Sequence, residues 1–262
     1  MPKIGEHRVV WMIRRFACFL RYTYPLPIVL FFFQEVRFTV NSMAPETPYW
    51  FESYLYAWDR AIFGELPAVV LADWVTKPLT ELMHAFYFAY YLILIGGLLV
   101  AWWGVEKSMP PGEANKNPVV NADLPPGPGF SSVITAMTLA FVLSFLHYPF
   151  LPARGPWENP ELMSRLPHFQ GVIFKPLIDL IIGHGAVSGG CFPSSHVAAS
   201  WGTVLGLGAV HRRAARWFGI VAVGMSVACV YTRYHHGVDV PAGLLVGLLG
   251  GWIGRKLAES PH

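Results

Sequence analysis

The stretch Leu79–Trp103, LTELMHAFYFAYYLILIGGLLVAWW, carries a single charged side chain, Glu81. Its length and apolarity are typical of a transmembrane helix, because a hydrocarbon core about 30 Å thick needs about 20 helical residues. Five further apolar segments accompany it, at about 24–40, 131–150, 193–210, 217–232 and 238–253. Backbone groups in lipid must bond within their own segment, so all six are expected to be helices. The fold class predicted is an all-α, polytopic membrane protein with six transmembrane helices and a helical-bundle catalytic core.

The composition of the whole chain agrees with a bilayer as its solvent. Of 262 residues, 54% are hydrophobic and only 13% are charged, whereas a globular domain has roughly 25% charged residues. The formal net charge of +3 is too small to indicate nucleic acid as a partner. The three cysteines fit neither a metal motif nor a disulfide framework. The N-terminal region lacks the small-residue cleavage site expected of a signal peptide.

Lysine and arginine predict the orientation of the chain. They gather in the N-terminal arm, in the segment 211–216 and near Arg255. With six spans these three places lie on one side of the membrane, which the positive-inside rule makes cytoplasmic. Both termini are therefore expected in the cytoplasm.

The domain organisation follows from the spacing of the apolar segments. Residues 1–105 hold the arm, the first two spans and an amphipathic segment, about 41–77, that is expected to lie on the outer membrane surface. Residues 106–130 are rich in proline and glycine and predict a flexible cytoplasmic loop. Residues 131–256 form the predicted four-helix catalytic core, and 257–262 are a tail.

Three polar clusters interrupt the apolar pattern, and the predicted topology brings all of them to the outer face. The first, Gly189-Gly-Cys-Phe-Pro-Ser-Ser-His196, opens the fourth span. A helix N-terminus offers unpaired N–H groups and partial positive charge, which suit a phosphate. Ser194, Ser195 and His196 are its candidate site residues, although a capped helix start with an incidental histidine would explain them equally well.

The second cluster, Thr232-Arg-Tyr-His-His-Gly-Val-Asp239, joins the fifth and sixth spans. His235 and Asp239 are four residues apart and would face each other on a helical turn. A carboxylate on one imidazole nitrogen leaves the other free as a nucleophile. A His–Asp pair that serves only stability is the alternative, and it would keep a costly charge at the membrane edge.

The third cluster contains His147 and Arg154, at the outer end of the third span. The guanidinium of Arg154 is a planar fork of donors suited to phosphate. By itself, however, an arginine at a helix end is more simply a snorkelling side chain.

Together the clusters resemble the type 2 phosphatidic acid phosphatase superfamily, over residues 131–256. Its pattern is Lys-x6-Arg-Pro, Pro-Ser-Gly-His and Ser-Arg-x5-His-x3-Asp. Here His147 takes the lysine place, the second motif reads Pro193-Ser-Ser-His196, and His235-x3-Asp239 closes the third. The Ser-Arg pair would fall on Ala228 and Cys229, so Arg233 is the candidate replacement. The run Arg233–Asp239 looks like the branch of inositol phosphorylceramide synthases and sphingomyelin synthases.

The resemblance implies a role for each residue. His235 attacks phosphorus, Asp239 orients it, and His196 protonates the leaving oxygen and then activates the acceptor. The remaining candidates, which the resemblance assigns to phosphate binding, are Arg154, Arg233, Ser194, Ser195 and His147. No cofactor and no metal is expected.

Three functions remain open at this stage. The first is a lipid phosphatase acting on a lipid phosphate through phosphohistidine. The second is a phosphotransferase that moves a phospho-headgroup from a phospholipid to an alcohol acceptor. The third is a transporter or non-enzymatic membrane protein, which would bury charges at the midplane of several spans.

Overall fold

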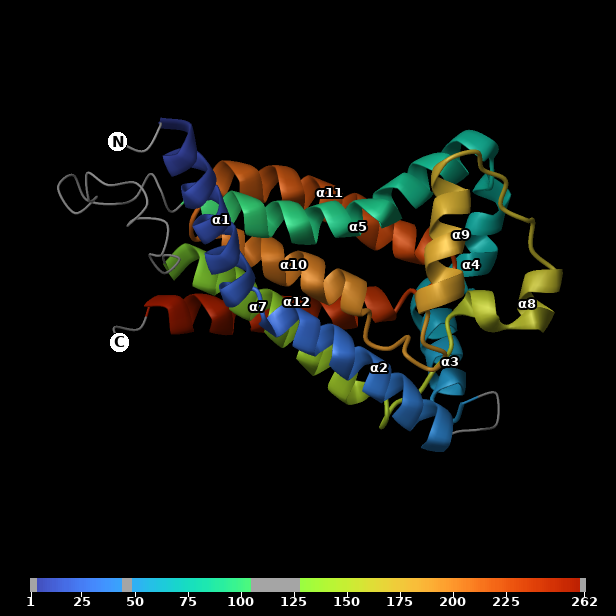
Figure 1. Ribbon diagram of the computed structural model, residues 1–262. Coiled ribbons are helices and arrows are strands. Elements are labelled where there is room, and N and C mark those ends of the chain that lie inside the picture. Colours follow the sequence, from blue (N-terminus) through green and yellow to red (C-terminus); the bar gives the residue numbers. More distant parts are fainter. Residues whose placement is uncertain (1–3, 44–48, 105–127, 260–262) are drawn as a thin grey trace.

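The computed structural model describes residues 4–43, 49–104 and 128–259, and the regular elements in these ranges are helices (Figure 1). The α-helices are α1 (Ile4–Tyr22), α2 (Pro25–Met43), α3 (Glu52–Phe63), α4 (Pro67–Val70), α5 (Lys77–Gly104), α7 (Pro128–His147), α8 (Pro160–Ser164), α9 (Phe174–Gly185), α10 (Ser195–Gly208), α11 (Arg212–Tyr231) and α12 (Asp239–Glu259). Short 3-10 helices cover Leu71–Trp74 and Pro156–Glu158. The all-α prediction is confirmed for the described residues.

The core of the bundle is made by α7, α10 and α12, which pack against one another, while α5 packs against α11. Glycines of α12 allow the close approach. A Cβ at Gly247 would lie 2.5 Å from the backbone oxygen of Ala198 in α10, and one at Gly254 would lie 2.8 Å from the backbone nitrogen of Ala136 in α7. Small residues at helix contacts are what membrane bundles use in place of a hydrophobic driving force.

Three helices in the described ranges, α5, α7 and α11, are long and apolar enough to cross a membrane. The α1–α2 pair, bent by 41° between Tyr22 and Pro25, adds a fourth if it counts as one span. Helices therefore occupy all six segments predicted to span, but six spans are not demonstrated. The reason lies in two helices. With 14 residues, α10 rises only about 21 Å, and the apolar part of α12 ends before Arg255.

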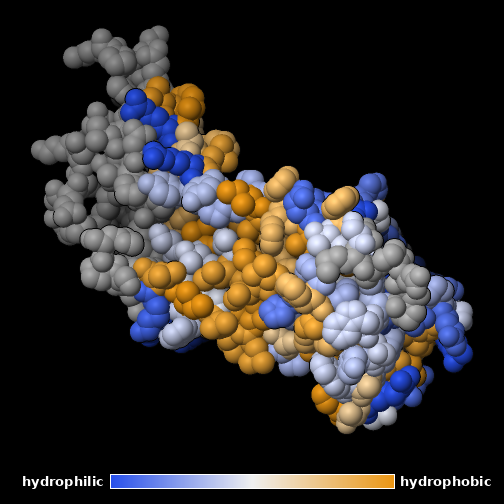
Figure 2. All heavy atoms as spheres, turned by 90° about the horizontal axis from the view of Figure 1, so that it is seen from below, coloured by the Kyte–Doolittle hydropathy of each residue, from blue (hydrophilic) through white to orange (hydrophobic). Residues whose placement is uncertain are grey.

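The outer surface of the bundle is apolar. Figure 2 shows a broad hydrophobic band across the middle of one face, with hydrophilic residues toward both ends. The exposed large side chains of the long helices include Leu30, Phe31, Ile95, Val223, Leu245 and Leu248. Such a girdle agrees with a bilayer and would be a liability in water.

The two ends of the bundle differ. The first turns of α1 and the last turns of α12 lie at one end, and α3, α4, α8 and α9 cover the other (Figure 1). The N-terminal arm is helical from Ile4, and α9 falls in a segment for which no helix was predicted. The amphipathic segment 41–77 is largely helical, as predicted, whereas most of the expected loop 106–130 lies outside the described residues.

Candidate active site

His235 lies in the turn between α11 and α12 and is held by both of its ring nitrogens. Its Nδ1 is 3.2 Å from Oδ2 of Asp239, the first residue of α12, and its Nε2 is 3.1 Å from Oγ of Ser194. Because a carboxylate only accepts, Nδ1 carries the proton and Nε2 keeps its lone pair. His235 is 5% exposed and Asp239 is fully buried. The contact between His235 and Asp239 that their spacing predicts is therefore present in the structure.

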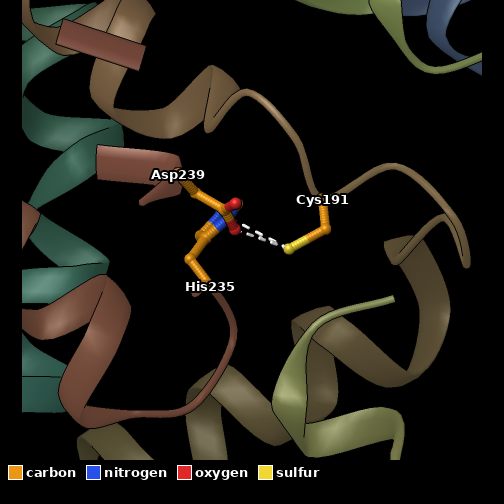
Figure 3. Close-up of side chains that lie close together, drawn as sticks. All are labelled: Cys191, His235 and Asp239. Carbon is orange, nitrogen blue, oxygen red and sulfur yellow. Dashed lines mark hydrogen bonds and ion pairs between the residues drawn. The ribbon is translucent and has the colours of Figure 1, made fainter. Parts of the chain in front are cut away.

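One oxygen of Asp239 gathers three donors. Besides the His235 ring, Oδ2 accepts the backbone N–H of His236 at 2.8 Å and the thiol of Cys191 at 2.8 Å. Figure 3 shows the side chains of Cys191, His235 and Asp239 converging from two separate segments. Within the described residues, the other oxygen, Oδ1, has no hydrogen-bond partner. The carboxylate orientation is therefore fixed from three sides.

The same three side chains offer metal-ligand atoms that lie within 4.8 Å of one another. A cysteine binds metal as its thiolate. Burial, and then the charge of Asp239, raise the pKa of Cys191 well above its ordinary value, so the thiol keeps its proton and acts as a donor. The geometry fits a hydrogen-bonded group better than a metal centre, and the expectation of no metal stays a prediction.

Ser194 connects His235 to the first turn of α10. It is the N-cap of that helix, and its Oγ accepts the N–H of Val197 at 3.4 Å while contacting His235. The backbone N–H of Ser194 donates to the carbonyl of Asp239 at 3.3 Å. The α10 N-terminus, which favours anions, therefore lies beside the nucleophilic nitrogen. Ser195 follows in the wall of the adjoining cavity.

His196 faces His235 across this site. The two ring centroids are 5.6 Å apart. Nε2 of His196 lies 3.1 Å from the hydroxyl of Tyr87, and the ring of Tyr90 packs on the imidazole with centroids 4.6 Å apart. Both tyrosines belong to α5. The structure thus brings together the two histidines whose roles the motif resemblance implies.

Arg154 is engaged elsewhere. Its guanidinium makes a two-pronged pair with Glu52 of α3, from Nε at 2.8 Å and from Nη2 at 3.0 Å. The hydrogen bond and charge of Glu52 raise the pKa of Arg154. Its backbone oxygen accepts the Nε2–H of His236 at 3.1 Å. Phosphate binding by Arg154 would require exchange of Glu52, and the role stays a prediction.

Arg233 and His147 also point to other partners. Arg233 adopts a left-handed backbone with φ of 67° and is 1% exposed. Its guanidinium lies 4.2 Å from the ring centre of Phe169 and donates to the sulfur of Met163 at 3.8 Å. Exposed His147 bonds to the carbonyl of Leu143, one turn back in α7. None of these contacts tests the phosphate-binding role predicted for the two residues.

Helix α3 is hydrogen-bonded to the loop that follows His235. Asp59 accepts the backbone N–H groups of Gly237 at 3.0 Å and Val238 at 2.9 Å. Its Oδ2 also lies 3.5 Å from Nδ1 of His236. Asp59 and Glu52 are seven residues apart and are both buried. One helix face therefore restrains both the Arg154 segment and the loop from His236 to Val238.

An apolar cavity of about 430 Å³ adjoins the two histidines. Its volume lies in the range of about 300–1,000 Å³ found for small-molecule sites. The walls come from α2, α5, α7 and the end of α9, and they include Leu30, Phe33, Ile95, Leu98, Phe141 and Ile182. From Tyr87 to Leu98 it follows α5 for about 16 Å of helix rise. The cavity therefore has a polar end, at Ser195, His196 and His235, and a long apolar remainder.

Several of these residues escaped prediction from the sequence. Tyr87, Asp59 and Glu158 carry no motif, and each acts on a segment far away in the chain. Glu158 lines the cavity, and burial raises the pKa of its carboxyl group.

Comparison with known proteins agrees with the motif assignment. Residues 124–253 match the model of the PAP2 superfamily. A lipid A 4'-phosphatase from Bacteroides thetaiotaomicron is 37% identical over 92 residues, which make up 33% of this chain and 40% of the relative. No solved structure gives a significant match. Neither match names an inositol phosphorylceramide synthase or a sphingomyelin synthase, so that branch rests on the sequence motif alone.

Proposed function

We propose that this protein is an integral membrane phosphatase that hydrolyses a lipid phosphate through a phosphohistidine at His235. The observation that carries the proposal is the pairing of His235 with Asp239, opposite His196, at the head of an apolar cavity. The similarity to a protein named lipid A 4'-phosphatase favours hydrolysis of a lipid phosphate.

The chemistry takes two steps. In the first, Nε2 of His235 attacks phosphorus, the bond to the lipid oxygen breaks, and that oxygen takes a proton from His196. In the second, His196 takes a proton from water, which attacks phosphorus and releases His235. Asp239 stabilises the imidazolium formed in the first step.

The phosphate is held, in this proposal, at the N-terminus of α10. The hydroxyl of Ser194 leaves Nε2 of His235 for a phosphoryl oxygen as the nucleophile engages, and Ser195 stands next to it in the cavity wall. Preorganised donors aimed at the developing charge are the largest single contribution in many enzymes. Arg154 and Arg233 add positive charge nearby, and direct contact requires a change of partner for each.

The openings of the cavity support a lipid as substrate. Leu30 of α2 and Ile95 of α5 line the cavity, yet they are 65% and 58% exposed on the outer surface of the bundle. The cavity therefore opens sideways, through the apolar girdle, where a lipid tail would enter from a bilayer. A water-soluble phosphate ester would need no such opening.

We also propose six spans with both termini in the cytoplasm and the site on the opposite face. Arginines at the start of α11 and the end of α12 lie at the end of the bundle that holds the termini. Exposed tryptophans occur toward both ends, with Trp217 in the first turns of α11, Trp252 in the last turns of α12, Trp50 just before α3 and Trp74 just after α4. Such aromatic belts favour the two interfaces of a membrane.

The test is phosphate release by the purified protein in detergent from phosphatidate, a polyprenyl phosphate and a phosphorylated lipid A disaccharide, with and without EDTA. The expected result is release that EDTA leaves unchanged, that His235→Ala abolishes and that Asp239→Asn lowers by about 10²–10⁴-fold. Near-normal activity of a folded His235→Ala variant would overturn the mechanism.

A phosphotransferase is the second candidate, and Glu158 is the observation that favours it. Glu158 lines the same cavity as His196, burial raises the pKa of its carboxyl group, and in this candidate that group orients the hydroxyl of an alcohol acceptor. Acceptor-dependent formation of a phosphodiester, without release of phosphate, would support this candidate. A transporter predicts charges at the midplane, whereas the polar groups described above gather at one end of the bundle.

A further inference from the structure

Tyr87 of α5 is the hydrogen-bonding partner of His196. The hydroxyl lies 3.1 Å from Nε2, the two ring centroids are 5.0 Å apart, and Tyr87 is 2% exposed. Helix α5 precedes the segment that matches the PAP2 superfamily. This contact therefore joins a motif histidine to a residue outside the matched segment.

The other ring nitrogen of His196 is oriented differently. Within the described residues, Nδ1 is buried and has no hydrogen-bond partner. His196 and His235 line the same cavity. With Nε2 occupied by Tyr87, Nδ1 is the nitrogen left to exchange a proton with a bound substrate.

We propose that Tyr87 is a positioning residue for His196. This inference rests on the proposed function. The phenol oxygen accepts the Nε2–H, which fixes the ring orientation and stabilises the imidazolium. The Nδ1–H then passes its proton to the lipid oxygen as the P–O bond breaks and the P–N bond to His235 forms. The neutral ring that results keeps Nε2–H on Tyr87 and uses the Nδ1 lone pair to take a proton from water.

In the part of the chain that the structure describes, Tyr87 is the side chain that is hydrogen-bonded to a ring nitrogen of His196. Besides Tyr87, the titratable side chains that contact this ring or line its cavity are Tyr90 and Tyr91 of α5, Tyr234 and His235 of the α11–α12 turn, Cys191 and Glu158. Asp239 is turned to His235, and Glu158 accepts the backbone N–H of Gly155 at 3.3 Å. A tyrosine thus takes the place of the carboxylate that usually orients a catalytic histidine.

The test uses two substrates that differ in their leaving group. For an alkyl phosphate, whose leaving oxygen needs a proton, Tyr87→Phe is expected to lower kcat/KM by about 10–100-fold. For an aryl phosphate with an acidic phenol, which needs none, the loss is expected to stay within about threefold. His196→Ala should show the same contrast. Tyr90→Phe, which removes a neighbouring phenol that has no hydrogen bond to His196, should show no such contrast.

A double variant separates positioning from structure. If Tyr87 acts through His196, adding Tyr87→Phe to His196→Ala should cost less than about twofold more. Equal losses on both substrates, no loss, or a further tenfold loss in the double variant would each overturn the inference. Wild-type protein that released no phosphate from either substrate would instead count against the proposed function. Thermal unfolding midpoints confirm that each variant is folded.

Discussion

At the scale of single residues, the site is organised around one oxygen atom. Oδ2 of Asp239 accepts from the His235 ring, the His236 backbone and the Cys191 thiol. Each donor comes from a different direction, so the carboxylate cannot rotate without losing one of them. A hydrogen bond to a charged group contributes about 1.5–3 kcal/mol. The rigidity of the nucleophile therefore derives from its partner.

Cys191 is expected to resist alkylation. Burial, with the charge of Asp239 beside it, raises the pKa of its thiol well above the ordinary value, and the thiolate is the reactive form. Iodoacetamide near neutral pH should label the folded protein slowly at Cys191, and labelling should quicken as pH rises toward the thiol pKa. Mass spectrometry of the modified peptide measures this. Unfolding in denaturant, where all three cysteines should react, is the control, and rapid labelling of the folded protein at neutral pH would contradict the expectation.

The contacts within one turn could be predicted from the sequence, and those between segments could not. His235 and Asp239 face each other because helical geometry brings together residues four apart. The position of Arg154 depends on Glu52, and that of Arg233 depends on Phe169. Neither partner lies within 50 residues of its arginine along the chain, and no local pattern indicates the pairing.

At the scale of elements, α3 acts as a brace across the site. Its buried face presents Glu52 to Arg154 and Asp59 to the turn before α12. The amphipathic pattern of 41–77 was sufficient to predict a helix in this segment. An amphipathic pattern predicts a helix on the membrane surface, but it does not indicate that Glu52 and Asp59 are buried. Burial of both carboxylates follows from the backbone donors and the guanidinium that they meet.

Asp59→Ala should damage activity more than overall folding. It leaves the N–H groups of Gly237 and Val238 buried without acceptors, at about 1–3 kcal/mol each. We expect a fall of several degrees in the unfolding midpoint and a loss of phosphate release of about tenfold or more, because this turn carries His235. Exposed Asp73, on the turn after α4, supplies the matched control as Asp73→Ala. Equal activity of the two variants would show that the brace is dispensable.

The His236–Asp59 contact predicts a pH dependence of stability. Burial alone lowers the pKa of His236, but the bond to Asp59 and the charges of Asp239 and Asp59 outweigh it and leave the pKa raised above 6.5. Because the pKa of His236 is higher in the folded than in the unfolded protein, protonation of His236 stabilises the folded state. This stabilisation is complete below about pH 6.5, the unfolded-state pKa, and it is lost as the pH rises through the folded-state pKa. Unfolding midpoints measured between about pH 6 and pH 9 should fall more steeply in wild type than in Asp59→Asn. Parallel curves for the two proteins would disprove the coupling.

Helix α9 could not be predicted from the sequence pattern. Its 12 residues are too few for a span, and it carries none of the polar motifs. Helix α9 packs against α5, and its residues Ile181 and Ile182 form part of the cavity wall. The cavity itself, formed by helices far apart in sequence, could not be predicted from any one of them.

At the scale of the whole molecule, the sideways opening of the cavity predicts that a bulky residue at the opening lowers activity on lipid substrates more than on water-soluble ones. Leu30→Trp adds bulk at the opening. We expect kcat/KM for a long-chain lipid phosphate to fall about tenfold and that for a short-chain, water-soluble analogue to be little changed. Leu245→Trp, on an equally exposed position of α12 that does not line the cavity, is the control. A uniform loss on both substrates would exclude the opening as the lipid route.

The contacts made by α3 have a consequence for transferring the site to another protein. The segment that matches the PAP2 superfamily contains His235 with His196 and Asp239, yet Glu52, Asp59 and Tyr87 all lie upstream of it. Grafted alone onto another scaffold, that segment would lack a counter-charge for Arg154, acceptors for two buried amides and a partner for one catalytic imidazole. The first hundred residues therefore contribute to the candidate site as much as the segment that matches the superfamily does.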